Sequence, residues 1–77
     1  MHHWPKPMLT IGENIYIIAD VYDSSTFYVP KDQIVAIESS PSGLNIFLVG
    51  GNNISIYADN ASSNDIVLQI VSDKGWV

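Results

Sequence analysis

The alternation in residues 44–58 constrains the fold most, because hydrophobic side chains recur at every second position on both sides of Gly50-Gly51. A period of two is typical of β-strands, and glycine supplies the positive φ that a tight hairpin loop needs. A three-residue Gly50-Gly51-Asn52 loop pairs Val49 with Asn53 and gathers one hydrophobic face, made of Leu44, Ile46, Leu48, Ile54, Ile56 and Ala58. A two-residue Gly51-Asn52 loop mixes polar side chains into that face. We therefore predict a hairpin with the three-residue loop.

Further strands are expected before this hairpin. Residues 8–11 predict a short strand and turn, followed by strands at residues 14–22, 26–29 and 33–38, which are rich in β-branched and aromatic residues. Pro30 cannot donate a backbone hydrogen bond and favours a turn, so the chain should bend there. In residues 14–22 the alternation assigns Ile15, Ile17, Ala19 and Val21 to the core, and Tyr16, Ile18, Asp20 and Tyr22 to a second, half-apolar face.

The C-terminal part predicts an amphipathic helix. Ile66, Val67, Ile70 and Val71 form one stripe at helical spacing, although their β-branched side chains leave a strand as the alternative. Ser62 with Asp65 indicates a weak capping box, and Gly75 can end the helix. The predicted fold is one domain at residues 8–77: a five-stranded antiparallel meander that forms a small sandwich or barrel-like sheet, with one C-terminal helix. Residues 1–7 are expected to be a flexible lead.

The pattern also resembles a known family, the small FlbD-type flagellar-associated proteins. The matching positions are Phe27, Val29, Asp32, Ile34, Ile37, Glu38, Ile46, Leu48, Gly51, Ile54, Ile56, Ile66, Val67 and Ile70. The resemblance covers residues 27–71, or begins at Met8 if an insertion is allowed. It implies a short β-rich chain with a C-terminal amphipathic helix, a role associated with flagellar operons and swarming, and no enzymatic activity. The segment before Phe27 departs from the family pattern.

Composition excludes several classes of function. The net charge is −5, and the chain contains no arginine and no cysteine. Nucleic-acid and anionic-membrane binding both need clustered cations, so neither is expected. Thiolate catalysis and thiolate metal sites are excluded. No apolar run reaches the roughly 20 residues that span a bilayer, and no signal peptide is visible, so a cytoplasmic location is expected.

The sequence offers few side chains that could act in catalysis or bind a cofactor. We expect no cofactor and no metal site, although His2 and His3 near a free amino terminus can bind adventitious Cu(II) or Ni(II). Aspartate pairs such as Asp20 with Asp23, or Asp59 with Asp65, fit turns and helix caps better than general acid–base catalysis. The Gly50-Gly51 pair joins two strands and lacks the pattern of a phosphate loop. The sequence therefore predicts a protein without catalytic residues.

What remains is association with another protein or with itself. Six apolar side chains are in excess of what a small domain leaves in solvent and are the interface candidates: Phe47, Val49, Tyr57, Tyr16, Ile18 and Tyr22. The early strands can instead fold over the hairpin, so that these side chains belong to one core. A mixture is the preferred interpretation, with internal burial for most and a homo-oligomeric contact for some, because aromatic residues are enriched at the centres of interfaces. The alternative is an acidic accessory protein or inhibitor, of the kind that phages encode, which binds a basic surface on a partner.

Overall fold

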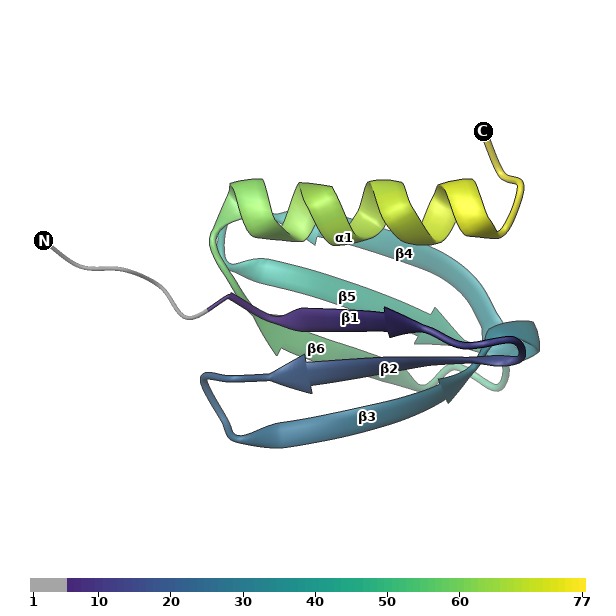
Figure 1. Cartoon of the computed structure of the whole chain (residues 1–77), viewed down its shortest axis with the longest axis horizontal. Helices are drawn as coiled ribbons and strands as arrows, with labels where there is room; N and C mark the ends of the chain where they lie inside the picture. The colour runs from purple at the N-terminus through teal and green to yellow at the C-terminus, as the bar shows by residue number, and fades with distance from the viewer. Residues whose placement is uncertain (1–5) are drawn as a thin grey trace, which may run out of the picture.

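The computed structural model describes residues 6–77, which form two three-stranded antiparallel sheets and one helix (Figure 1). Sheet A has the order β1-β2-β3, with bounds Met8–Ile11, Ile15–Asp20 and Ser25–Pro30. Sheet B has the order β4-β5-β6, with bounds Ile34–Ser40, Gly43–Leu48 and Asn53–Tyr57. The short 3-10 helix η1 (Lys31–Gln33) joins the sheets, and α1 (Asn60–Asp73) follows β6. The mainly β class with a C-terminal helix is confirmed.

The prediction of one five-stranded meander is wrong, because the described chain divides into two sheets between β3 and β4. Pro30 ends β3 and has no N–H to continue a ladder. The next residue, Lys31, donates its backbone N–H to the carbonyl of Asn14 at 2.9 Å, which holds the chain at the start of β2 while η1 turns it away. The turn expected at Pro30 is therefore present, and its effect is to start a second sheet.

The two faces of β2 are the reverse of those predicted. Tyr16, Ile18 and Asp20 point into the core, whereas Ile15, Ile17 and Ala19 lie on the outer face and are only partly buried. Both faces carry apolar side chains, so alternation alone could not choose between them. Most inward polar atoms have a partner: the Tyr16 hydroxyl donates to Asp73, and Asp20 Oδ1 accepts from the backbone N–H groups of the following turn, whereas Asp20 Oδ2 is unpaired among the described residues.

The β5–β6 hairpin confirms the predicted hydrophobic face and corrects the loop. The register pairs Ile46 with Ile54, and the Leu48 N–H donates to the Asn52 carbonyl at 2.8 Å. The three loop residues are therefore 49–51, one position earlier than expected, with Gly50 and Gly51 both at positive φ. The pairing is shifted by two residues relative to the prediction. A shift of two leaves every side chain on the same face, so the hydrophobic pattern could not detect it.

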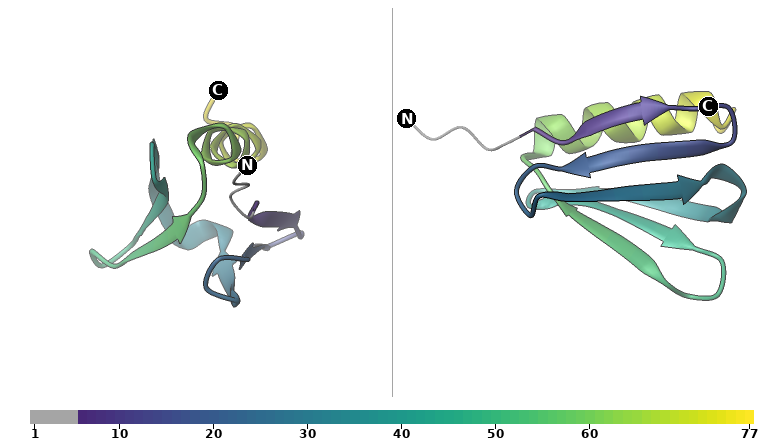
Figure 2. Two further views of the ribbon diagram at one scale, coloured as in Figure 1. Left: turned by 90° about the vertical axis from the view of Figure 1, so that its left-hand side faces the viewer. Right: turned by 60° about the horizontal axis from the view of Figure 1, so that its bottom comes forward.

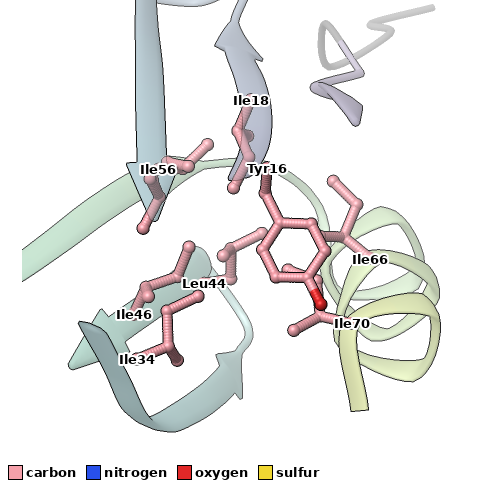
Figure 3. Packing of buried hydrophobic residues seen from close by; sticks show 9 residues of the cluster. Tyr16, Ile18, Ile34, Leu44, Ile46, Ile56, Ile66 and Ile70 are labelled. Atoms are coloured by element: carbon pink, nitrogen blue, oxygen red, sulfur yellow. The ribbon is translucent and has the colours of Figure 1, made fainter. Parts of the chain in front are cut away.

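One core is shared by both sheets and α1 (Figure 3). It consists of Tyr16, Ile18, Val29, Ile34, Leu44, Ile46, Ile56, Ile66 and Ile70. The helix packs against β4 and β5 and contributes the predicted stripe, with Ile66 and Ile70 fully buried. Nearly every side chain of this core is aliphatic, so burial of apolar surface is the main source of its stability. Within the described residues, no helix is long and apolar enough to cross a membrane.

The helix is confirmed for residues 66–71, but it begins earlier than predicted. Asp59 is the N-cap, and its carboxylate accepts a hydrogen bond from the Ser62 N–H at 2.7 Å, so the expected Ser62 and Asp65 capping box is wrong. At the other end, Gly75 follows the last turn of the helix as predicted, with a φ of 75°. Gly75 N–H donates to Ser72 and Trp76 N–H donates to Val71, at 3.1 and 2.9 Å, which is a Schellman motif.

Gly43 is a position where a side chain cannot be accommodated. It begins β5 at a φ of 155°, and an added Cβ atom would lie 2.0 Å from the backbone carbonyl oxygen of Ile56. We expect Gly43→Ala to lower the free energy of unfolding by at least about 3 kcal/mol, because the central hairpin must shift to relieve the contact. Urea unfolding monitored by circular dichroism measures this change.

The matched control is Gly51→Ala. Gly51 also has a positive φ, of 87°, but its Cβ would meet nothing within 4 Å. Only the backbone strain remains, so the loss should be about 1 kcal/mol. Equal losses in the two variants would show that the close approach at Gly43 does not limit the hairpin.

Candidate functional site

Two of the predicted interface residues are core residues. Tyr16 and Ile18 are fully buried between the sheets and the helix, so their assignment to an interface is wrong. The reason is the reversed orientation of β2, which turns these side chains inward. The other four candidates, Phe47, Val49, Tyr57 and Tyr22, are exposed.

The four exposed candidates do not form one patch. Phe47 and Val49 lie at one end of the hairpin, and Tyr57 lies at the other, where its ring is 5.0 Å from that of Tyr22. Between them, a row of polar side chains crosses the exposed face of sheet B: Asn45 donates to Glu38 at 2.9 Å and Ser55 donates to Asn45 at 2.6 Å. These polar groups satisfy one another, which is typical of a surface that faces water. An interface role for the four residues stays a prediction.

A larger apolar surface lies on the outer face of sheet A, and it includes the β2 residues Ile15, Ile17 and Ala19, whose predicted assignment to the core is wrong. This face, called the outer face here, consists of Met8, Thr10, Ile15, Ile17, Ala19, Thr26, Tyr28 and Pro30. The register places Thr10, Ile17 and Tyr28 in one row across the three strands. Met8 and Tyr28 expose 68% and 67% of their surfaces. None of these side chains carries a charge. The only sequence signal for this surface is that β2 has isoleucine at both odd and even positions, so that an apolar side chain must face outward whichever face is buried.

A polar cluster at the C-terminal end of α1 joins three elements and is called the polar clasp here. Asp73 Oδ2 accepts a hydrogen bond from the Tyr16 hydroxyl at 2.5 Å and pairs with Lys31 Nζ at 2.8 Å. Lys31 Nζ also lies 5.1 Å from the centre of the Tyr16 ring, and Lys74 Nζ donates to the Lys31 carbonyl. The clasp therefore connects β2, η1 and α1 through groups that satisfy one another.

The electrostatics of the polar clasp support a structural role. The hydrogen bond from Lys31, followed by that from Tyr16, lowers the pKa of Asp73. Burial, followed by the hydrogen bond to Asp73, raises the pKa of the Tyr16 hydroxyl well above its usual value. At neutral pH the carboxylate is thus ionised and the phenol is protonated, which is the combination that this hydrogen bond needs. Neither group is tuned toward neutral pH, where a general acid or base works best.

The predicted aspartate pairs also have structural surroundings. Asp20 Oδ1 accepts from the N–H groups of Tyr22 and Asp23 at 3.0 and 3.3 Å, so it shapes the β2–β3 turn. The buried Asp20 Oδ2 has no hydrogen-bond partner among the described residues. Asp59 caps α1, which lowers its pKa through the Ser62 N–H, and Asp65 accepts from Gln69 at 3.0 Å. The described part of the chain holds no cluster of three metal-binding side chains, and His2 and His3 lie outside it.

Comparison with known proteins does not extend this description: no protein-family model, curated protein or solved structure matches the chain. The resemblance to the FlbD-type proteins therefore stays a prediction. The surfaces described above carry the functional argument on their own.

The polar clasp predicts a pH-dependent stability. The pKa of Asp73 is lower in the folded state than the value of about 3.9 in an unfolded chain. Its ionised form therefore stabilises the fold above pH 3.9, and this contribution is lost as the pH falls through the lower, folded-state pKa. We expect Asp73→Asn to lower the free energy of unfolding at pH 7 and to have little effect at pH 2. Urea unfolding at pH 7, 4 and 2 measures the difference.

Lys31→Met removes the cation of the same pair and should show the same pH dependence. The double variant should lose less at pH 7 than the sum of the two single variants, because both remove one interaction. A loss in Asp73→Asn that is as large at pH 2 as at pH 7 would contradict the assignment of the ion pair.

Proposed function

We propose that this protein is a non-enzymatic association module that binds a second copy of itself through the outer face of sheet A. The observation that carries the proposal is an apolar sheet face that neither the helix nor sheet B covers. Ile17 lies at its centre, with Ile15 beside it on β2 and Tyr28 beside it on β3, and the core lies on the opposite side of the same strands. A face of this kind typically marks a contact with another protein.

Charge favours a second copy as the occupant. The chain has a net charge of −5, so two copies repel each other wherever their charged residues meet. The outer face carries no charged side chain, and two such faces can meet without bringing like charges into contact. A strongly charged partner would gain no ion pair there. The surface is therefore complementary to an uncharged apolar face, which this chain itself supplies.

The size of the face indicates a weak contact. Six residues of β2 at ~3.3 Å and three strands at ~4.8 Å cover roughly 300 Å² of sheet. This is the size of patches that are often functional on monomers. Two such faces together bury only about 600 Å², which is less than the roughly 1,000 Å² that a stable interface exceeds. We therefore expect a dimer that forms reversibly, with a population that rises with protein concentration.

The exposed face of sheet B supports this role less well. Its central positions, Glu38, Asn45 and Ser55, already bond to one another, and burying them would remove the water that surrounds this polar row. Phe47 and Tyr57 lie on either side of the row and do not touch each other across it. We therefore assign self-association to sheet A and not to the residues first expected to form the interface.

Introduction of a charge at the outer face tests the proposal. Tyr28→Lys places a cation beside Ile17 on the outer face of each copy, so the two copies repel and one apolar contact is lost. We expect the variant to remain monomeric at concentrations where the unmodified protein is dimeric. Light scattering coupled to size-exclusion chromatography, at several concentrations, measures the mass.

The control is the pair Phe47→Ser and Tyr57→Ser on sheet B. Both side chains are exposed, so the fold should persist and the mass should equal that of the unmodified protein. Circular dichroism verifies that every variant is folded. If the sheet B variants become monomeric and Tyr28→Lys does not, the contact lies on sheet B and our assignment is wrong.

A further inference from the structure

A groove runs along the seam between β1 and α1. It consists of two adjoining hollows that share Asp65 and Gln69 on the helix. Lys6, Pro7 and Leu9 line the first hollow, near the start of α1, and Ile11 lines the second, near the end of α1. The helix packs on β4 and β5 of sheet B, and it runs alongside β1 (Figure 2).

The β1 side of the groove is the edge of sheet A. Gly12 N–H donates to the Ile15 carbonyl at 2.9 Å, which makes these two residues a hydrogen-bonded pair at the turn between β1 and β2. In an antiparallel ladder such pairs alternate, so Thr10 and Met8 bond to β2 while Leu9 and Ile11 direct their N–H and C=O groups away from it. The backbone of Leu9 and Ile11 therefore faces the groove and can accept another strand.

The helix side of the groove supplies surfaces for the side chains of such a strand. Leu68 exposes 61% of its surface and Ile11 exposes 43%, and both line the second hollow. A strand added beside β1 would cover the exposed side chain of Leu68. Asp65 lies between the two hollows, so it offers a carboxylate midway along the groove.

The charges around the groove define its ligand further. At one end Lys6 lies close enough to Asp59 to lower the pKa of that carboxyl group, after the larger effect of the Ser62 hydrogen bonds. At the other end Asp73 is paired with Lys31. Asp65 is the groove carboxylate that has no cation as a partner among the described residues. Together with the net charge of −5, this favours a ligand with a positive charge at its centre.

We propose that this groove binds an extended, basic peptide of a partner protein, which adds to sheet A as a fourth strand beside β1. The peptide backbone bonds to the N–H and C=O groups of Leu9 and Ile11. An apolar side chain covers Ile11 and Leu68, and a lysine or arginine pairs with Asp65. Strand addition of this kind obtains its affinity from the main chain and its specificity from alternate side chains. The site is independent of the outer face used for self-association.

The first experiment uses three capped seven-residue peptides as probes, in which valine alternates with lysine, with threonine or with glutamate. Each is titrated into the ¹⁵N-labelled full chain, and amide chemical shifts are followed by NMR. The lysine peptide should shift the amides of Leu9, Ile11 and Leu68, and the glutamate peptide should bind at least about tenfold more weakly because it meets Asp65. A lysine peptide with N-methylated backbone amides should not bind, since it cannot complete the ladder.

Variants then separate the backbone from the side-chain contribution. Ile11→Ala keeps the N–H and trims the side chain, whereas Ile11→Pro also removes the N–H that faces the groove and leaves the ladder to β2 intact. We expect the affinity for the lysine peptide to be at least about tenfold lower in Ile11→Pro than in Ile11→Ala. Asp65→Asn should remove most of the preference for the lysine peptide over the threonine peptide. The charge-matched control is Asp32→Asn, because Asp32 is an exposed carboxylate on η1, away from the groove.

Three results would overturn the proposal. The first is that none of the peptides shifts Leu9 and Ile11 at millimolar concentration. The second is equal binding of the lysine and glutamate peptides. The third is that, without peptide, these two amides become more protected from hydrogen exchange as the protein concentration rises. That result would show that a second copy occupies the edge. Tyr28→Lys should leave peptide binding unchanged, so a failure here is distinguishable from a failure of self-association.

Discussion

The inward orientation of Tyr16 is the constraint on which the rest of the structure depends. Its ring lies between the sheets and the helix (Figure 3). Its hydroxyl donates to Asp73 at the end of α1. A buried hydroxyl without a partner would cost about 1 to 3 kcal/mol, so the position of the helix end and the orientation of β2 are coupled. Lys31 reinforces the coupling, because it follows the Pro30 bend and pairs with the same carboxylate.

This choice of face determines which surfaces are left for function. Since β2 turns Tyr16 and Ile18 inward, its other isoleucines must lie outside, and the outer face of sheet A is apolar. In sheet B the sequence leaves no ambiguity about which face is buried. The hairpin has hydrophobic side chains on one face and a hydrogen-bonded polar row at the centre of the other. The two sheets therefore differ in character: sheet B faces water through polar groups, and sheet A presents a neutral surface suited to association.

The position of α1 produces the second surface. The helix uses Ile66 and Ile70 to close the core over β4 and β5, and the stripe is too narrow to bury a residue such as Leu68 as well. Its neighbour β1 is a short strand that pairs with β2 on one side only. A one-sided strand beside a partly covered helix leaves both backbone and apolar side chains available. The proposed self-association on the face of sheet A and the proposed peptide binding at its edge are compatible, because they use different surfaces of the same strands.

The sequence by itself determined the local structure. The alternation around Gly50-Gly51 identified the hairpin and its hydrophobic face, the spacing of Ile66 and Ile70 identified the helix stripe, and Gly75 marked the helix end. These features depend on periodicity and on backbone conformations that nearby residues set. The start of α1 at Asp59 is also local, because the cap accepts from the N–H of nearby Ser62. The break into two sheets and the orientation of β2 were decided by tertiary structure. Each depends on a contact between distant residues, as between Tyr16 and Asp73, and a strand with isoleucine on both faces carries no local signal that chooses between them.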